Sequence, residues 1–235
     1  MAREVIVTAD KIKKRKKALL RTKIIIGIII LILLIIFIVL SIVYNVNRFT
    51  ISLDSKLDSE KGITLYSDYY ERAHQRKLFA STLNDMDNIT YEWIPKDVNS
   101  SSTGGSHNGD NYLAYTFYIE NEGEISVNYW YTIIIDDAIK RVDEAIRVIV
   151  YLNDEETIYA KKNSETGLAE ENTEAFYKDD VVVLKPRKDF KVGDVDKFTI
   201  VIYIEGEDPD CLNDIIGGEI KMHMEIREEH LDEES

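Results

Sequence analysis

One acidic segment of the sequence concentrates side chains that could bind a metal ion. A hard cation such as Ca²⁺ takes about six to eight oxygen ligands, and carboxylates gathered on one loop can supply them. The segment EGEDPDCLNDIIGGE, residues 205–219, has such carboxylates at Glu205, Glu207, Asp208, Asp210 and Asp214. Their spacing differs from that of an EF-hand loop. The alternative interpretation is a solvated turn that opens at Asp208-Pro209.

The only cysteine of the chain, Cys211, lies in the same segment. A sortase-type transpeptidase, which also combines an N-terminal anchor with a β-fold, needs a thiolate with a His and an Arg. Such enzymes place their cysteine in a TLxTC strand. Cys211 instead follows Asp208-Pro209-Asp210, and these carboxylates would raise the pKa of the thiol. The sequence contains no HExxH, no GxSxG and no phosphate-binding loop, so we expect no enzymatic activity and no cofactor other than Ca²⁺.

Basic and acidic residues are separated along the chain. Residues 1–23 contain nine Lys or Arg and two acidic residues, a net charge of +7. The whole chain carries −14 and residues 24–44 are uncharged, so residues 45–235 carry −21. Such a domain attracts cations and repels nucleic acid, so we expect no nucleic-acid partner. A single cysteine excludes a disulfide within the chain, which is typical of a bacterial surface protein.

An uninterrupted apolar run, Ile24–Tyr44, separates the two charged regions. At about 1.5 Å per residue its 21 residues would extend about 31 Å as a helix, enough to cross a hydrocarbon core of about 30 Å. In lipid a single span satisfies its backbone amides only as a helix. The sequence therefore predicts a transmembrane helix at 24–44 and a cytoplasmic basic tail at 1–23, with the rest of the chain outside. No small-x-small cleavage site follows the run, which favours an uncleaved signal anchor.

The region between the span and the main domain, residues 45–88, is predicted to form a stalk and a short juxtamembrane helix. Arg48–Ile63 is polar and is interpreted as the stalk. Leu65–Leu83 has apolar or aromatic residues at approximately helical spacing, with Ser67 as the N-cap.

Residues 89–227 are predicted to form the main domain, and 228–235 an acidic tail. The domain contains about eight alternating or apolar runs typical of strands: 89–94, 112–120, 125–135, 146–152, 156–160, 181–184, 198–205 and 219–226. We expect hairpins over 112–135 and 146–160. Residues 161–180 are interpreted as a polar loop with helical potential at Gly167–Phe176.

This pattern predicts an all-β fold, an antiparallel β-sandwich of the jelly-roll type. Alternate residues of two strong strands would face its core, together with the neighbourhood of Trp130. The expected inward residues are Tyr115, Phe117, Ile119, Ile200, Ile202 and Ile204.

Two segments carry a resemblance to known proteins. AYTFYIENEGEISVNYWY at Ala114–Tyr131 and DKFTIVIYIEGEDPDCLNDIIGGEIKMHMEI at Asp196–Ile226 resemble a group of uncharacterised single-span surface proteins of Gram-positive, Firmicutes-type bacteria. More loosely, the chain is similar to camelysin and TasA-type biofilm proteins, which are secreted jelly-roll sandwiches with a turn like Asn121-Glu122-Gly123. The resemblance implies an anchored ectodomain and transfers no active-site residue.

These observations lead to one main functional hypothesis and two alternatives. The main hypothesis is a single-pass membrane protein whose outer β-sandwich has a non-enzymatic structural or interaction role at the cell surface. It would bind a protein partner or associate with itself. The first alternative is a secreted matrix or fibre subunit of the TasA or camelysin type that polymerises by strand exchange. The second is the sortase-like transpeptidase.

Overall fold

The computed structural model describes residues 2–44, 49–83, 85–100 and 104–228. The chain divides into two compact units, Met1–Val46 and Asn47–Ser235. The acidic tail predicted for 228–235 lies outside the described residues, except for Glu228.

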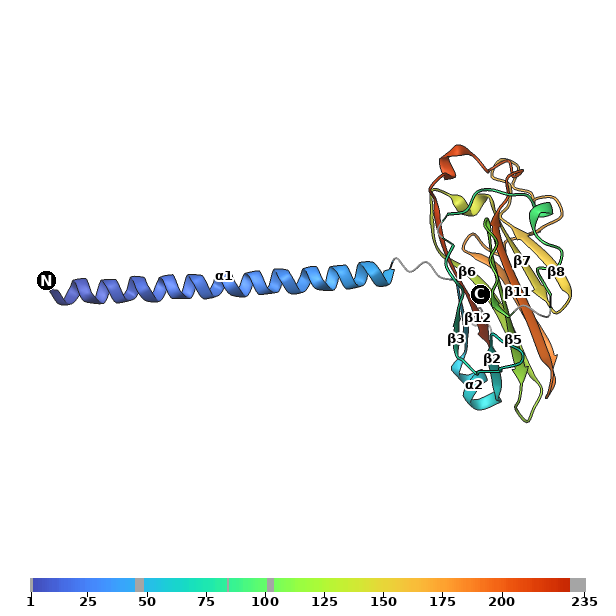
Figure 1. The fold of residues 1–235 in the computed structure, drawn as a ribbon, viewed down its shortest axis with the longest axis horizontal. Helices are drawn as coiled ribbons and strands as arrows, with labels where there is room; N and C mark the ends of the chain where they lie inside the picture. The colour runs from blue at the N-terminus through green and yellow to red at the C-terminus, as the bar shows by residue number, and fades with distance from the viewer. Residues whose placement is uncertain (1, 45–48, 84, 101–103, 229–235) are drawn as a thin grey trace, which may run out of the picture. The chain divides into compact units, whose positions relative to one another are not determined.

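The first unit is one continuous helix, α1 (Ala2–Tyr44), which includes both the basic segment and the apolar run (Figure 1). Among the described residues, α1 is the one helix long and apolar enough to cross a membrane, with the candidate span at Lys11–Leu40. The apolar side chains are exposed on every side of the helix; Ile24, for example, is 53% exposed and Leu40 is 61% exposed. A helix that is apolar on every side requires apolar surroundings, and a bilayer supplies them.

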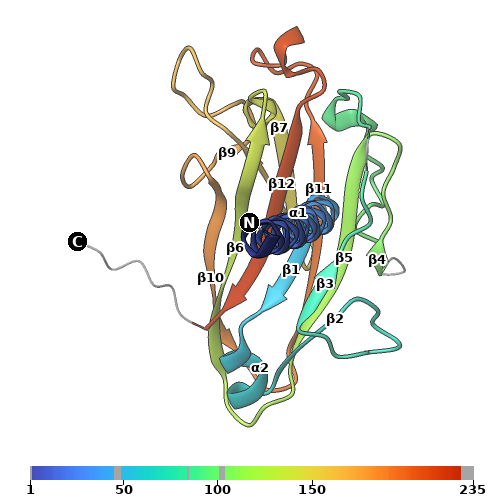
Figure 2. The ribbon, with the colours of Figure 1, turned by 90° about the vertical axis from the view of Figure 1, so that its left-hand side faces the viewer.

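The second unit consists of two β-sheets (Figure 2). The five-stranded sheet has the order β10 (Val181–Phe190), β6 (Val127–Ile139), β12 (Glu219–Arg227), β1 (Thr50–Leu53) and β3 (Lys77–Phe79). The seven-stranded sheet has the order β2 (Ile63–Tyr66), β5 (Tyr112–Asn121), β11 (Val195–Ile204), β7 (Ile146–Leu152), β8 (Glu155–Ala160) and β9 (Glu174–Ala175), with β4 (Gly105–Ser106) also beside β5.

Short helices complete the second unit. They are α2 (Ser55–Lys61) and the 3₁₀ helices η1 (Tyr91–Trp93), η2 (Val142–Glu144) and η3 (Asn213–Ile215).

Both sheets are mixed, whereas the sequence predicts purely antiparallel pairing. Most neighbours are antiparallel, but β1 runs parallel to β12 and β9 runs parallel to β8. In each parallel pair the added strand is short, four residues in β1 and two in β9. The alternation of apolar residues determines which face of a strand is buried. Because the same alternation occurs in parallel and antiparallel strands, it does not reveal the direction of a strand.

The two sheets bury one common core. Phe117 of β5 stacks on Phe198 of β11 with ring centroids 5.2 Å apart, and Tyr131 of β6 meets Phe198 edge-on at 5.3 Å from the other sheet. The predicted inward residues of β5 are buried, as are Ile200 and Ile202, whereas Ile204 is only half-buried. Near Trp130 the core residues are its two neighbours, Tyr129 and Tyr131. The predominance of β-structure is therefore confirmed.

One predicted hairpin is wrong. Tyr112–Asn121 and Val127–Ile139 lie in different sheets, so the turn between them leads from one sheet to the other at the surface and does not pair its two strands. Gly123 lets this turn pack closely against the end of α2, because a Cβ at Gly123 would lie 1.9 Å from the carbonyl oxygen of Lys61. The other predicted hairpin, β7–β8, is confirmed by continuous antiparallel pairing from Arg147–Ala160 to Leu152–Glu155.

The predicted stalk and juxtamembrane helix are also wrong. The stalk segment contains β1, a strand of the five-stranded sheet, and α2. This helix has its own sequence signals, because Asp54 accepts the Lys56 amide at its start and Gly62, at φ 72°, ends it in the left-handed conformation. Residues 65–83, predicted as a helix, instead contribute to β2 and β3.

Two aromatic residues of that predicted helix, Tyr66 and Tyr69, pack on the seven-stranded sheet. Tyr66 of β2 stacks on Tyr118 of β5 with centroids 5.6 Å apart, and Tyr69 lies 5.4 Å from the same ring. Their spacing therefore reflects contact with β5 and not one face of a helix.

Two further predictions for surface segments are wrong. Ile89–Ile94 forms a single bridge at Ile89 followed by η1, not a strand, and Gly167–Phe176 contains β9 and no helix. Ile89 and Ile94 are apolar because they cover the outer face of the seven-stranded sheet. They form a second buried cluster with Val98, Ala114, Ile149, Val201 and Tyr203.

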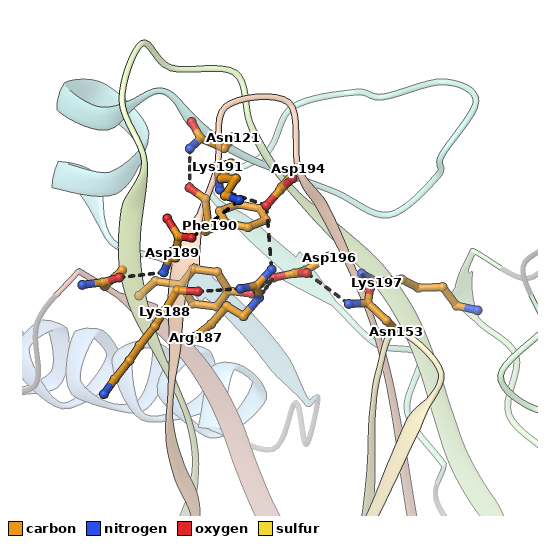
Figure 3. A network of polar contacts seen from close by, with 12 residues as sticks. Asn121, Asn153, Arg187, Lys188, Asp189, Phe190, Lys191, Asp194, Asp196 and Lys197 are labelled. Atoms are coloured by element: carbon orange, nitrogen blue, oxygen red, sulfur yellow. Dashed lines mark hydrogen bonds and ion pairs between the residues drawn. The ribbon is translucent and has the colours of Figure 1, made fainter.

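A buried polar network ties the two sheets together at one end (Figure 3). Asp196 of β11 is 1% exposed and accepts hydrogen bonds from Tyr129 of β6 at 2.6 Å and Arg187 of β10 at 2.9 Å. Its other oxygen accepts the side-chain amide of Asn153, in the β7–β8 turn, at 3.1 Å. The carboxylate is therefore paired on both oxygens, as a buried charge requires.

Candidate functional site

An open cleft of about 940 Å³ lies on the outer face of β7, β8 and β11. Its walls are Tyr91 on η1, strand β8 and the loop that leads into β9, and residues 205–209 close one side. Its ionisable lining is strongly acidic. It comprises one guanidinium, Arg147, and seven carboxylates: Glu156, Glu170, Glu171, Glu174, Glu205, Glu207 and Asp208.

The floor of the cleft contains a buried ion pair and a second buried carboxylate. The Arg147 guanidinium, 7% exposed, lies 2.6 Å from a carboxylate oxygen of Asp208, whose side chain is fully buried. Glu205, also buried, accepts the Tyr203 hydroxyl and the Glu207 amide, each at 3.2 Å. Burial and the neighbouring Glu205 raise the pKa of Tyr203 above its ordinary value, so the phenol stays a donor. The floor thus contains two buried carboxylates and one guanidinium, which is paired with Asp208, so negative charge is in excess there.

The β8 wall presents a carboxylate held by two phenols. Glu156 accepts the Tyr91 hydroxyl at 2.9 Å and also the Tyr151 hydroxyl. Burial, and then the bond to Glu156, raise the pKa of both tyrosines. The phenols therefore remain protonated at neutral pH and hold the Glu156 carboxylate in a fixed position in the cleft.

Two carboxylates of the cleft, Glu170 and Asp208, and the neighbouring Asp210 come close enough to share a cation. Glu170, Asp208 and Asp210 each place one oxygen within 4.8 Å of the others. The Glu170 Oε1 atom is buried and has no hydrogen-bond partner among the described residues. Asp210 accepts the Ser164 amide at 2.9 Å and the Ser164 hydroxyl. Burial opposes ionisation of Asp210, but these two bonds outweigh it and lower its pKa.

Only two of the five carboxylates predicted to bind Ca²⁺, Asp208 and Asp210, belong to this group. Glu205 and Glu207 line the cleft elsewhere, and Asp214 lies on η3. The third member, Glu170, comes from a loop distant in sequence, which no local spacing could identify. Asp208 is also committed to Arg147, so this acidic turn is partly a structural element and not simply a solvated one.

Cys211 is partly buried beside the same turn. Burial, and then the negative charge of Asp208, raise the pKa of its thiol. A nucleophilic cysteine requires the reverse shift.

No family model matches the chain, and no curated protein matches it. Among solved structures, it is similar to a β-glucosidase from Kluyveromyces marxianus in complex with glucose, with 14% identity and a TM-score of 0.29. The alignment covers 78% of this chain and 18% of the glucosidase, so the chain spans less than a fifth of that protein. At this TM-score the likeness carries no argument about fold or activity.

Proposed function

We propose that this protein is a single-pass membrane protein with a cytoplasmic basic tail and an outer β-domain that has a non-enzymatic interaction or structural role at a bacterial cell surface. The observation that carries the proposal is α1, whose apolar side chains are exposed on every side, followed by a domain with its own core. The charge difference across α1 favours the orientation, since Lys and Arg remain on the cytoplasmic side.

For the outer domain we infer a sandwich of the jelly-roll type. The order β1-β12-β6-β10 in one sheet and β5-β11-β7-β8 in the other supports it, because successive strands repeatedly change sheets, as in two Greek keys. The parallel entry of β1 departs from the antiparallel pattern.

The single cysteine gives a direct test of orientation. In cells without their wall, a membrane-impermeant maleimide applied at mildly alkaline pH should label Cys211 before lysis. A matched variant, Cys211→Ser with Thr8→Cys in the basic tail, should be labelled only after lysis. The reverse pattern would contradict the proposed orientation, and labelling of both only after lysis would place the whole chain inside.

A secreted matrix or fibre subunit is the second candidate function, favoured by one observation. β1, the first element after α1, is a four-residue strand between β12 and β3. A short strand in this position could leave its own sheet and complete the sheet of a second copy. The masses of the protein in membrane and medium fractions distinguish the two functions. Full-length protein in the membrane supports the anchor, whereas a released form that begins after residue 44 supports the subunit.

The acidic turn supports a Ca²⁺-stabilised module within the same domain. The unpartnered oxygen of Glu170 near Asp208 and Asp210 is the favouring observation. Millimolar Ca²⁺ should raise the melting temperature of the wild type and not that of a Glu170→Gln variant. Melting curves that are insensitive to Ca²⁺ would remove this module.

A further inference from the structure

Within the part of the chain that the structure describes, part of the β8 backbone at the acidic cleft has no neighbouring strand. Along one side β7 pairs with all of β8, from Glu155 to Ala160. Along the other side β9 pairs only with Tyr159 and Ala160. Residues 155–158 therefore form an open sheet edge, and three of them line the cleft.

The loop before β9 explains why this edge stays open. Both the amide and the hydroxyl of Thr173 donate to the Glu170 carbonyl, at 3.2 and 2.9 Å. This turn directs the chain away from β8 until Glu174, and the cleft lies between the loop and the open edge. Space is thus present beside an unpaired strand, which is the arrangement that accepts an extended peptide by strand addition.

Charge selects which peptide this edge can accept. The exposed carboxylates of Glu156, Glu171 and Glu207 line the cleft, while its one guanidinium is already paired with Asp208. A second copy of this domain, with its large negative charge, would be repelled from the edge. A strand with Lys or Arg at alternate positions would place these side chains on one face, about 7 Å apart, against the carboxylates.

We propose that the cleft binds an extended, lysine-rich polypeptide segment, which adds to the open edge of β8 as a further strand. The backbone of β8 supplies the hydrogen bonds, and the acidic lining selects the basic side chains. This inference goes beyond the proposed surface role, because it names the chemistry of a partner and does not depend on the orientation of α1.

The test uses full-length protein in neutral detergent, with EDTA present so that divalent cations do not compete. The probe is a fluorescein-labelled peptide of alternating Lys and Thr, and binding is followed by fluorescence anisotropy over a series of salt concentrations. The Lys-Thr peptide should bind, with affinity falling as salt increases, and a Glu-Thr peptide should not. Equal binding of the two peptides would overturn the proposal.

Backbone methylation separates strand addition from simple charge attraction. In an added strand, every second backbone amide of the peptide faces β8. Two isomers of the Lys-Thr peptide, N-methylated at odd or at even residues, should therefore differ in affinity. One should bind like the parent, and the other should lose at least about tenfold in affinity because its hydrogen bonds are removed. Equal affinities of the two isomers would exclude strand addition.

A charge-neutralised variant tests the location. Glu171→Gln with Glu207→Gln removes two exposed carboxylates of the cleft, and we expect about a fivefold loss of affinity at low salt. The matched control is Glu124→Gln with Glu122→Gln on the exposed β5–β6 turn, which should leave binding unchanged. Equal losses in both variants, with equal melting temperatures, would place the peptide elsewhere.

Discussion

At the scale of single residues, buried ionisable groups decide how this domain responds to pH. Tyr129 and Tyr203 are buried and Tyr151 is half-buried, each beside a carboxylate, and both burial and negative charge favour the neutral phenol. Each phenol also donates a hydrogen bond to a carboxylate: Asp196, Glu156 and Glu205, respectively. Deprotonation would remove the donor and create a repelling pair of anions.

The raised tyrosine pKa values predict alkaline destabilisation. The ordinary value of 10.0 applies to the unfolded chain, so above pH 10 the unfolded state loses protons before the folded state does. These tyrosines should therefore leave the free energy of unfolding unchanged below pH 10. Above pH 10 they should lower it progressively as the pH rises. Urea denaturation at a series of alkaline pH values measures this slope, and Tyr151→Phe should reduce it. A slope that Tyr151→Phe leaves unchanged would contradict the assignment.

Cys211 should react slowly with alkylating reagents in the folded protein. Burial and Asp208 raise its thiol pKa above the ordinary value of 9.0, so little thiolate is present near neutral pH. The rate of iodoacetamide modification should increase only at alkaline pH and should be faster in urea at the same pH. A rate midpoint below pH 8 in the folded protein would instead indicate an activated thiolate and revive the transpeptidase hypothesis.

At the scale of structural elements, the junctions between the two sheets depend on polar pairing and close backbone contact. Asp196 joins β11 to β6 and β10, and Gly123 lets the β5–β6 turn pack closely against the end of α2. Neither feature adds apolar area. Their loss should therefore affect stability through unpaired charge or steric overlap.

Removing the Asp196 carboxylate should destabilise the domain strongly. Asp196→Ala leaves the buried Tyr129 hydroxyl without its acceptor and leaves Arg187 with only the more distant Asp194, at 3.8 Å, and should cost about 3–5 kcal/mol. Tyr129→Phe removes one hydrogen bond to the same carboxylate and should cost about 1–3 kcal/mol. Chemical denaturation measures both. Because the two residues are in contact, the double variant should cost less than the sum of the single variants, and additive losses would argue against a shared network.

Gly123→Ala should destabilise the domain by steric overlap. The new Cβ would lie 1.9 Å from a backbone carbonyl, so the turn or α2 must shift, at a cost of about 1–3 kcal/mol or more. Gly167→Ala is the matched control, because no atom lies within 4 Å of its Cβ position and only its φ of 68° is unfavourable. That control should cost about 1 kcal/mol. Equal melting temperatures of the two variants would contradict the close approach of Gly123 to the Lys61 carbonyl.

The sequence predicts these elements better than it predicts their partners. Alternation identifies β5, β6, β7, β11 and β12 because one face of each is buried against the core. It cannot distinguish a hairpin from a connection between two sheets, because that depends on the strands that β5 and β6 find as neighbours in the folded domain: β2 and β11 for β5, β10 and β12 for β6. Similarly, the sequence identifies Asp208 and Asp210 as neighbours, but neither Glu170 nor Arg147 could be assigned to them, since tertiary contact alone brings these residues together.

At the scale of the whole molecule, the two units have different solvent requirements. α1 exposes apolar surface on every side, whereas the second unit encloses a core formed by both sheets. The charge is divided in the same way, with +7 on residues 1–23 and −21 on residues 45–235.

Removal of the first unit should leave a soluble, folded domain. A chain beginning at Asn47 retains both sheets and the common core. It should remain in solution without detergent and melt cooperatively, close to the transition of the full-length protein in neutral detergent. Sedimentation and circular dichroism measure both properties. Aggregation or the loss of a cooperative transition would mean that α1 contributes to the folding of the domain.

The position of β1 has a mechanical consequence. If α1 is held in a membrane, as proposed, any tension on it enters the second unit through β1, because β1 is the first strand after α1. β1 pairs with β12 on one side and β3 on the other, and Phe49 and Ile51 at its start are buried in the core. A pull on the anchor is thus divided between two neighbouring strands, and extraction of β1 would have to expose those side chains to water. Under such tension, release of β1 would therefore also expose buried core residues and disrupt the five-stranded sheet.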